Sequence, residues 1–180
     1  MTARPGFTRK AVLVLGVTAV VAVLLDQWVK HLSTEGLTEG EPVRILGGLV
    51  YLSLLRNSGA AFSLGSDYTW VFPVITLAVI GWIAYMTRRL RSVPWAVSLG
   101  LVLGGALGNL IDRLFRAPGP FQGHVVDMIS VFAPYGERFA VFNIADSCLS
   151  VGVVIAVLLE LTGRQRDGSR TVQKKDEEKS

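Results

Sequence analysis

Two aspartates stand in apolar sequence where folding alone gives them no role. Asp127 lies within Gly-His-Val-Val-Asp-Met-Ile, and Asp146 lies at the head of an apolar run that reaches Leu159. A carboxylate in or beside a lipid bilayer is costly unless it is paired or faces water, so an ionisable residue there indicates a functional site. Two of them at one membrane edge strengthen that indication.

A pair of carboxyl groups is suited to the hydrolysis of a peptide bond by water. When two carboxyls share a site, repulsion between like charges keeps one of them protonated, so the pair holds an acid and a base together. The ionised member can deprotonate a water molecule while the other protonates or hydrogen-bonds the scissile carbonyl oxygen. Composition alone does not say whether Asp127 and Asp146 touch.

The sequence lacks the motifs of two other kinds of hydrolase. Ser58 stands in Asn-Ser-Gly and forms no Gly-x-Ser-x-Gly elbow, and His-Glu-x-x-His is absent. His124 and Asp127 are spaced as a metal pair would be, but two ligands are too few for a metal site. The single cysteine, Cys148, excludes an intrachain disulfide and a multi-cysteine metal site. We therefore expect no metal site.

The composition predicts an integral membrane protein. The chain has 180 residues, of which 51% are hydrophobic, and its mean hydropathy is +0.46. Its pI near 9.5 does not indicate nucleic-acid binding, because the basic residues cluster beside apolar segments and at the tail, where they orient a protein in a membrane.

Four long apolar segments position the candidate residues. An uncharged run of about 20 residues can cross the hydrocarbon core of a bilayer, and the first segment lacks the cleavage site of a signal peptide. We predict an all-α integral membrane protein with four transmembrane helices, at about 11–30, 68–87, 92–113 and 139–162. The fourth would carry Asn143 and Asp146 in its first turns.

The segments between and after the helices have other compositions. Residues 31–67 contain glycines, a proline and two apolar runs at 43–46 and 49–55, which predicts a small β-rich element on the membrane surface. Residues 116–138 read as a loop that carries Asp127. We predict one domain over residues 1–162 and a disordered, charged cytoplasmic tail over 163–180.

The positive charges predict the orientation. Twelve of the 18 lysines and arginines lie on one side if both termini are cytoplasmic: three before the first helix, three at 88–91 and six in the tail. The positive-inside rule favours this arrangement. Asp127 and Asp146 then lie at the outer edge, together with Asp26, Asn57, Asn109, Arg113 and Asn143.

Several polar and small residues recur at helical spacing. Asp26 and Lys30 are four residues apart and can form an ion pair at the end of the first helix, with Lys30 extending to water. Asp112 and Arg116 can pair in the same way. Gly100, Gly104 and Gly108 form a stripe that permits close contact between helices in lipid.

Five segments in order resemble the motifs of the bacterial lipoprotein signal peptidases, the signal peptidase II family. Each is weak alone, but together they are specific. They are Asp26-Gln-Trp-Val-Lys30, Asn57-Ser-Gly-Ala-Ala-Phe-Ser63, Gly104-Gly-Ala-Leu-Gly-Asn-Leu-Ile-Asp-Arg113, Gly123-His-Val-Val-Asp127 and Phe142-Asn-Ile-Ala-Asp-Ser147. Met128 departs mildly from the phenylalanine expected there.

This resemblance implies a membrane aspartic peptidase with a small extracytoplasmic β-cradle. It implies that the enzyme cleaves prolipoproteins before a diacylglyceryl-modified cysteine, needs no cofactor and is inhibited by globomycin. Asp127 and Asp146 would be the catalytic dyad, and the expected substrate-binding residues are Asn57, Asn109, Arg113 and Asn143. Asp26, Lys30 and Gly108 would have structural or supporting roles. We expect a monomer in the bacterial cytoplasmic membrane.

Two other functions fit parts of the pattern. In a proton-coupled carrier or channel component, membrane aspartates relay protons, but such carboxylates would be spread through the membrane depth rather than gathered at one edge. A structural assembly subunit would use the glycine stripe but would leave Asp127 and Asp146 without partners.

Overall fold

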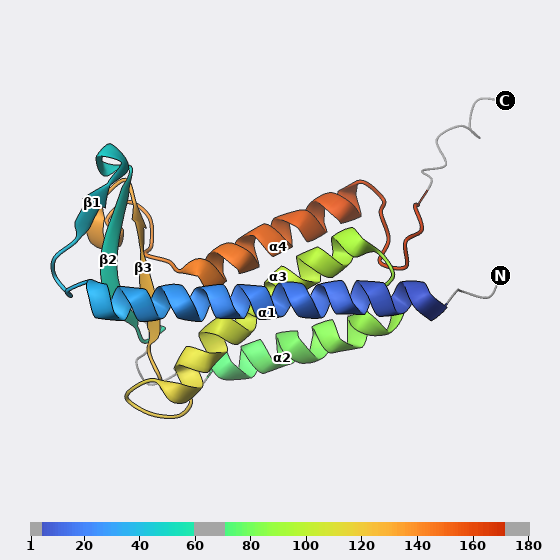
Figure 1. The fold of residues 1–180 in the computed structure, drawn as a ribbon, viewed down its shortest axis with the longest axis horizontal. Helices are drawn as coiled ribbons and strands as arrows, with labels where there is room; N and C mark the ends of the chain where they lie inside the picture. Colours follow the sequence, from blue (N-terminus) through green and yellow to red (C-terminus); the bar gives the residue numbers. More distant parts are fainter. Residues whose placement is uncertain (1–4, 60–70, 172–180) are drawn as a thin grey trace.

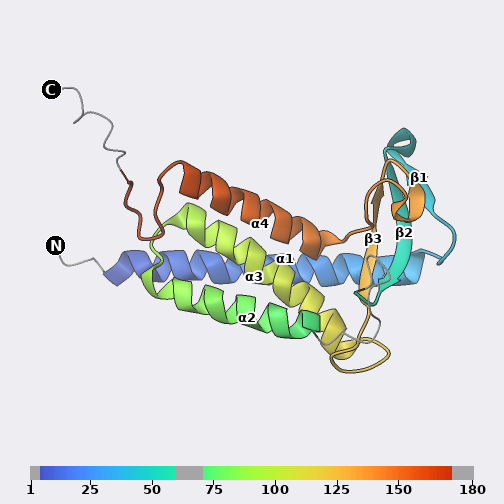
Figure 2. The ribbon, with the colours of Figure 1, turned by 180° about the vertical axis from the view of Figure 1, so that it is seen from behind.

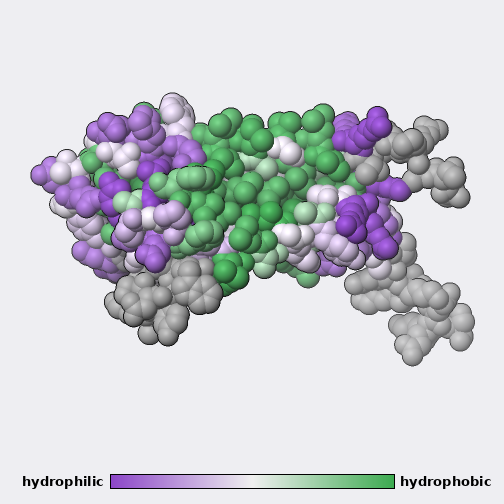
Figure 3. All heavy atoms as spheres, turned by 90° about the horizontal axis from the view of Figure 1, so that it is seen from below, coloured by the Kyte–Doolittle hydropathy of each residue, from purple (hydrophilic) through white to green (hydrophobic). Residues whose placement is uncertain are grey.

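The protein is a bundle of four helices with a small sheet at one end (Figure 1). The computed structural model describes residues 5–59 and 71–171. Its helices are α1 (Pro5–Gly36), α2 (Val71–Met86), α3 (Val93–Phe115) and α4 (Ile144–Leu161). All four are long and apolar enough to cross a membrane when α2 is counted with the 3-10 turn that extends it to Arg89. Hydrophobic residues cover the middle of the molecule and hydrophilic ones gather at both ends (Figure 3).

Helix α3 is the centre of the bundle, and glycines bring its neighbours close. A Cβ added to Gly104 would lie 2.8 Å from the carbonyl oxygen of Ala19 in α1. On the side facing α4, a Cβ added to Gly152 would lie 2.8 Å from the carbonyl oxygen of Ser98, whose hydroxyl donates to the Gly152 carbonyl at 2.7 Å. The predicted stripe at Gly100, Gly104 and Gly108 therefore does provide close helix contact.

The sheet has three antiparallel strands in the order β1 (Val43–Ile45), β2 (Val50–Asn57) and β3 (Val125–Val131). It stands across the end of the bundle opposite the start of α1 and the end of α4 (Figure 2). The two strands expected from residues 43–55 are present. The third strand lies in the segment predicted to be a loop. Because β3 is buried on both faces along most of its length, it has no alternation of polar and apolar residues to reveal it.

The helix boundaries differ from the predicted ones at two places that matter for the site. Helix α1 continues to Gly36, so Lys30 lies inside the helix rather than at its end. Helix α4 begins at Ile144 rather than near residue 139, because Asn143 caps its N-terminus. For the second predicted helix, residues 68–70 lie outside the described residues.

The segment after α4 is folded over residues 163–171, so the predicted disordered tail does not begin at Gly163. The indole Nε1 of Trp95 donates to the carbonyl oxygen of Arg164 at 2.7 Å. The carbonyl oxygen of Arg166 accepts from the backbone N–H groups of Arg91 and Ser92, at 2.9 and 3.0 Å. These bonds hold the segment against the connection between α2 and α3. Residues 172–180 lie outside the described part of the chain.

Candidate active site

The predicted site residues meet in a pocket of about 330 Å³ between the bundle and the sheet. Both aspartates line it, together with three of the four residues expected to bind substrate. Its polar lining consists of Asn57, Thr76, Asn109, Arg113, Asp127 and Asp146. Apolar side chains from α2, α3, α4 and β3 complete the wall. The fourth expected residue, Asn143, is fully buried behind the two carboxylates.

Asp127 reaches the pocket from β3 and is held by the neighbouring strand. Its Oδ2 atom accepts a hydrogen bond of 2.9 Å from Nδ2 of Asn57 at the end of β2. Between Leu52 and Leu55 the register of β2 against β3 shifts by one residue, so that Leu55 pairs with Asp127. Since a one-residue shift moves side chains to the other face of a strand, this bulge brings Asn57 to the face that Asp127 occupies.

Asp146 is fixed by the start of α4. The side chain of Asn143 accepts from the Asp146 backbone N–H at 2.9 Å, and Oδ2 of Asp146 accepts from the Asn143 backbone N–H at 3.2 Å. This reciprocal capping box satisfies backbone N–H groups that a helix start leaves without partners. The negative charge of Asp146 also lies at the positive end of the α4 dipole.

Asn143 links the two carboxylates. Its Nδ2 donates to Oδ1 of Asp127 at 2.7 Å while its Oδ1 caps α4 beside Asp146. Asn109 holds Asp146 from the other side, because its Nδ2 donates to Oδ1 of Asp146 at 2.8 Å. The orientation of the Asn109 amide is defined, since its Oδ1 accepts from Lys30 Nζ at 3.0 Å and from Asn143 Nδ2 at 3.1 Å.

Lys30 does not extend to water, contrary to the sequence prediction. Its side chain is fully buried, and its Nζ lies 2.8 Å from Oδ2 of Asp26 and 2.8 Å from Oδ2 of Asp112. The predicted pair Asp26–Lys30 is thus confirmed, but in the interior. Asp112 also accepts from Arg116 Nε at 2.6 Å, as its spacing predicts. A buried lysine is tolerated here because opposite charges and hydrogen bonds surround it.

Gly108 allows this ion pair to reach α3. A Cβ at this position would lie 2.7 Å from Oδ2 of Asp26 and 3.2 Å from Cβ of Ala145. Asp26 in turn accepts from the Ala145 backbone N–H at 2.8 Å, so it also ties α1 to the start of α4. The supporting roles expected for Asp26, Lys30 and Gly108 therefore have a geometric basis.

Arg113 is nearly buried on the α2 side of the pocket. Its Cζ lies 4.8 Å from the ring centroid of Phe72, a cation–π contact between α3 and α2. Its NH1 donates to the carbonyl oxygen of Gly123 at 3.4 Å. The guanidinium group is thereby held at the pocket wall near both aspartates.

Burial changes the acidity of Asp127. Desolvation raises the pKa of Asp127 from its ordinary value of 3.8 to about 6, and the Asp146 carboxylate adds to this increase. The hydrogen bonds from Asn57 and Asn143, and the positive charge of Lys30, act in the opposite direction. A carboxyl group with this pKa can exchange a proton near neutral pH, as a general acid or base requires.

A family model for signal peptidase (SPase) II matches residues 18–162. The chain belongs to the signal peptidase II family. It is therefore an aspartic protease, and its four apolar helices fit a multi-pass protein of the inner membrane. The matched range contains every residue of the pocket and of the ion-pair cluster behind it.

Similar proteins support the assignment to this family. Lipoprotein signal peptidase of Streptomyces coelicolor is 48% identical over 161 residues, covering 89% of this chain and 76% of that protein. The protein of the same name from Rhodococcus jostii is 45% identical, covering 91% and 80%. A solved bacterial membrane enzyme, at 2.3 Å resolution, is 28% identical with a TM-score of 0.71, covering 87% of this chain and 93% of the other.

Sequence reasoning missed several contacts of this signal peptidase II site, including those of Gln27 with Asp26 and Asp112. The contact of Asp112 with Lys30 was not foreseen, although Gly104, Gly108 and Asp112 continue one stripe at a spacing of four residues toward α1. Phe72 gave no signal, because an aromatic residue in an apolar helix is ordinarily a packing residue. The structure also shows an amide partner for each aspartate, Asn57 for Asp127 and Asn109 for Asp146. The assembly-subunit hypothesis had predicted no partner for either one.

Proposed function

We propose that this protein removes signal peptides from prolipoproteins by cleaving the bond before a diacylglyceryl-modified cysteine. Asp127 and Asp146 form the catalytic dyad. The observation that carries the proposal is the convergence of both carboxylates, from β3 and α4, on one pocket at the end of a membrane-spanning bundle. The names of the relatives, lipoprotein signal peptidase, support the choice of substrate.

The dyad acts through one shared proton. One carboxylate deprotonates a water molecule in the pocket, and the protonated partner donates to the carbonyl oxygen of the scissile bond. As the tetrahedral intermediate collapses, the proton taken from water passes to the leaving nitrogen, and a hydroxyl proton of the intermediate returns to the other carboxylate, which restores the dyad. Asn143 sets the geometry of the pair, because it donates to Asp127 and caps the helix start that carries Asp146. The apparent pKa values of the reaction belong to the pair.

The remaining polar groups bind the substrate around the dyad. Asn57, Asn109 and Arg113 line the pocket beside the carboxylates and supply donors for backbone carbonyl groups and the lipidated cysteine. Ile75 and Val79 of α2 form an apolar wall that suits an acyl chain or the signal-peptide helix. All of these groups come from one chain, so the protein acts as a monomer, in contact with membrane lipids.

The positive charges define the orientation that we propose. Both termini and the turn at 88–91 face the cytoplasm, and the sheet and the dyad lie at the outer face. The charged groups behind the pocket gather at this one end of the bundle, which favours a peptidase over a carrier with carboxylates spread through the membrane.

Cleavage of a lipidated prolipoprotein by the purified protein in detergent tests the proposal. Followed by gel shift, wild type should give a product that begins at the lipidated cysteine, and globomycin should block its formation. Asp146→Asn should lower the rate by at least about 100-fold, the range that a lost general acid or base accounts for.

A matched carboxylate-to-amide change serves as the control. Glu137→Gln alters an exposed carboxylate at the same end of the molecule and should leave the rate unchanged. Both variants must elute as folded protein. Cleavage by folded Asp146→Asn at the wild-type rate would rule out the dyad, and no cleavage by folded wild type would rule out the peptidase activity on this substrate.

A further inference from the structure

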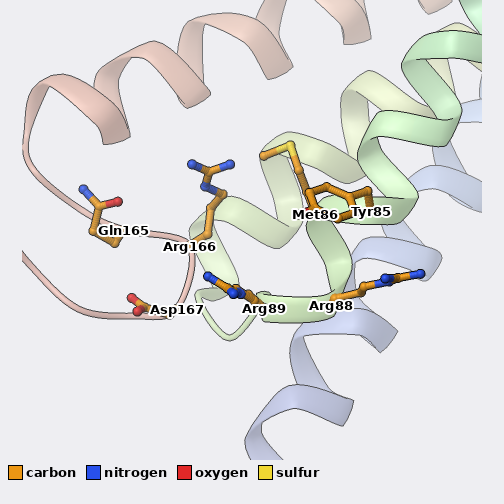
Figure 4. Close-up of a pocket in the computed structure, with 7 residues that line it drawn as sticks. All are labelled: Tyr85, Met86, Arg88, Arg89, Gln165, Arg166 and Asp167. Atoms are coloured by element: carbon orange, nitrogen blue, oxygen red, sulfur yellow. The ribbon is translucent and has the colours of Figure 1, made fainter.

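A second pocket, of about 420 Å³, lies at the opposite end of the bundle from the dyad. It is formed where α2 ends, between the turn that leads to α3 and the segment that follows α4 (Figure 4). Its lining is rich in basic residues: Tyr85, Met86, Arg88, Arg89, Gln165, Arg166 and Asp167. The proposed peptidase reaction uses none of these groups.

The walls of this pocket are fixed to each other. The Arg166 carbonyl oxygen accepts from two backbone N–H groups of the α2–α3 turn, at 2.9 and 3.0 Å. The guanidinium of Arg166 stacks over the buried Trp95, with 5.6 Å between Cζ and the ring centroid. Gln165 donates to the hydroxyl of Thr171 at 3.0 Å. The segment is therefore held in place by main-chain and side-chain contacts before any ligand arrives.

Two arginines line the pocket from different walls, Arg89 from the α2–α3 turn and Arg166 from the segment after α4, and the Arg166 side chain extends away from Arg89 (Figure 4). Figure 4 shows Arg89 extending toward the segment that carries Arg166, while Arg88 extends the other way, where its Cζ lies 5.7 Å from the ring centroid of Tyr85. Within residues 5–59 and 71–171, neither Arg89 nor Arg166 forms an ion pair. The one carboxylate in the lining, Asp167, accepts from the N–H and hydroxyl of Ser169, at 2.9 and 2.6 Å. The pocket thus keeps an excess of positive charge.

The pocket lies at the height of lipid headgroups. The apolar span of α2 reaches to Arg89, and α4 ends at Leu161, just before the segment that forms the other wall. Tyr85 is 67% exposed on the last turn of α2, and tyrosines at such positions mark the membrane interface. The two guanidinium groups thus lie beyond the hydrocarbon region, next to an apolar surface.

We propose that this pocket binds the phosphate of an anionic phospholipid headgroup. Arg89 and Arg166 donate to the phosphate oxygens, as planar guanidinium groups do in bidentate pairs, and Tyr85 and Met86 border the start of the acyl chains. The site is separate from the dyad, so it stands whether or not the proposed peptidase function is correct. An anionic lipid bound here would tie the segment after α4 to the end of α2.

Native mass spectrometry of the full-length protein tests this site. The protein is titrated in detergent with phosphatidylglycerol, and in a parallel series with phosphatidylcholine, which carries a phosphate but no net charge. We expect the first phosphatidylglycerol to bind more tightly than the first phosphatidylcholine. The double variant Arg89→Gln/Arg166→Gln should bind phosphatidylglycerol roughly 10- to 30-fold more weakly, the effect of two interfacial charges.

Matched variants separate a specific site from general charge. Arg138→Gln removes an exposed arginine at the sheet end and should bind phosphatidylglycerol as wild type does. Arg89→Lys/Arg166→Lys keeps both charges but loses the bidentate geometry, so its affinity for phosphatidylglycerol should lie between those of wild type and the double glutamine variant. If the double glutamine variant unfolds, the single change Arg89→Gln, at an exposed residue outside the bundle core, gives the answer.

Two results would overturn the assignment. Equal phosphatidylglycerol affinity in wild type and in folded Arg89→Gln/Arg166→Gln would exclude this pocket as the lipid site. The second result comes from adding inorganic phosphate at millimolar concentration without lipid. If it binds to wild type but not to the double variant, and phosphatidylglycerol binds no more tightly than phosphatidylcholine, the ligand is a soluble phosphate rather than a lipid.

Discussion

The two sides of α3 use polar residues in opposite ways. Toward α1, Gly104 and Gly108 bring the backbones together, and the buried Lys30 pairs with both Asp26 and Asp112, while Arg116 supplies the second positive charge at Asp112. Toward α2, the same helix borders a pocket, and its Arg113 forms a cation–π contact with Phe72 of that neighbour. One side is closed by paired charges, and the other borders an open pocket.

Asn109 joins the closed side to the open side. Its Oδ1 accepts from Lys30, which forces its Nδ2 to point toward Asp146 at the pocket. The buried ion pairs therefore do more than hold α1 and α3 together. They determine which way an amide next to the proposed dyad faces, so the open side is ordered before substrate binds.

The largest effect is expected from breaking the closed side. Lys30→Met removes the ammonium group that pairs with both Asp26 and Asp112, and it leaves the buried Asp26 carboxylate without an ion pair among the described residues. Removing one partner of a buried ion pair typically costs about 3–5 kcal/mol. We expect a loss of this size in the free energy of unfolding, measured by denaturation in detergent micelles.

Two further variants test the reason for that loss. Lys10→Met changes an exposed lysine at the other end of α1 and should leave stability unchanged. Adding Asp26→Asn to Lys30→Met removes one uncompensated charge and should restore part of the stability. If the double variant is less stable than Lys30→Met alone, packing of Lys30 rather than charge neutralisation accounts for the effect.

On the closed side, the sequence predicted the contacts within one helix but not those between helices. The glycine stripe and the pair Asp26–Lys30 follow from helical spacing, because residues four apart share a face. The burial of Lys30 does not, since its second partner, Asp112, lies on a different helix. On the open side, Asp127 was placed in a loop because β3 is covered on both faces and its sequence does not alternate. Long-range packing decides both features.

On the open side, ionisation of the buried Asp127 should lower the free energy of unfolding as the pH rises. Between pH 3.8 and about 6, folded protein holds a proton on Asp127 that the unfolded chain has released, so the free energy of unfolding falls as pH rises through this window. A pKa difference of this size corresponds to about 2–3 kcal/mol. In Asp127→Asn the side chain cannot ionise, so its free energy of unfolding should not show this decrease.

Denaturation of both proteins at several pH values measures this cost. The stability of Asp127→Asn minus that of wild type should increase from about pH 4 to pH 6 and stay constant above pH 7. Glu137→Gln, which alters an exposed carboxylate, should show no such trend relative to wild type. A difference for Asp127→Asn that stays the same from pH 4 to pH 8 would contradict the raised pKa of Asp127.

The smallest effect is expected at the contact that borders the open side. Phe72→Leu keeps an apolar side chain on α2 but removes the ring that faces Arg113 at 4.8 Å. Because Phe72 is 41% exposed, this cation–π contact contributes about 0.5–1 kcal/mol. If the ring only holds Arg113 in position for the substrate, KM for prolipoprotein cleavage should rise about two- to fivefold with little change in kcat, because uniform binding is what is lost.

Phe72→Tyr retains the ring and should match wild type, as should Phe115→Leu at an exposed residue at the end of α3. An equal rise in KM for Phe72→Tyr and Phe72→Leu would assign the role of residue 72 to its shape in the pocket and not to its contact with Arg113.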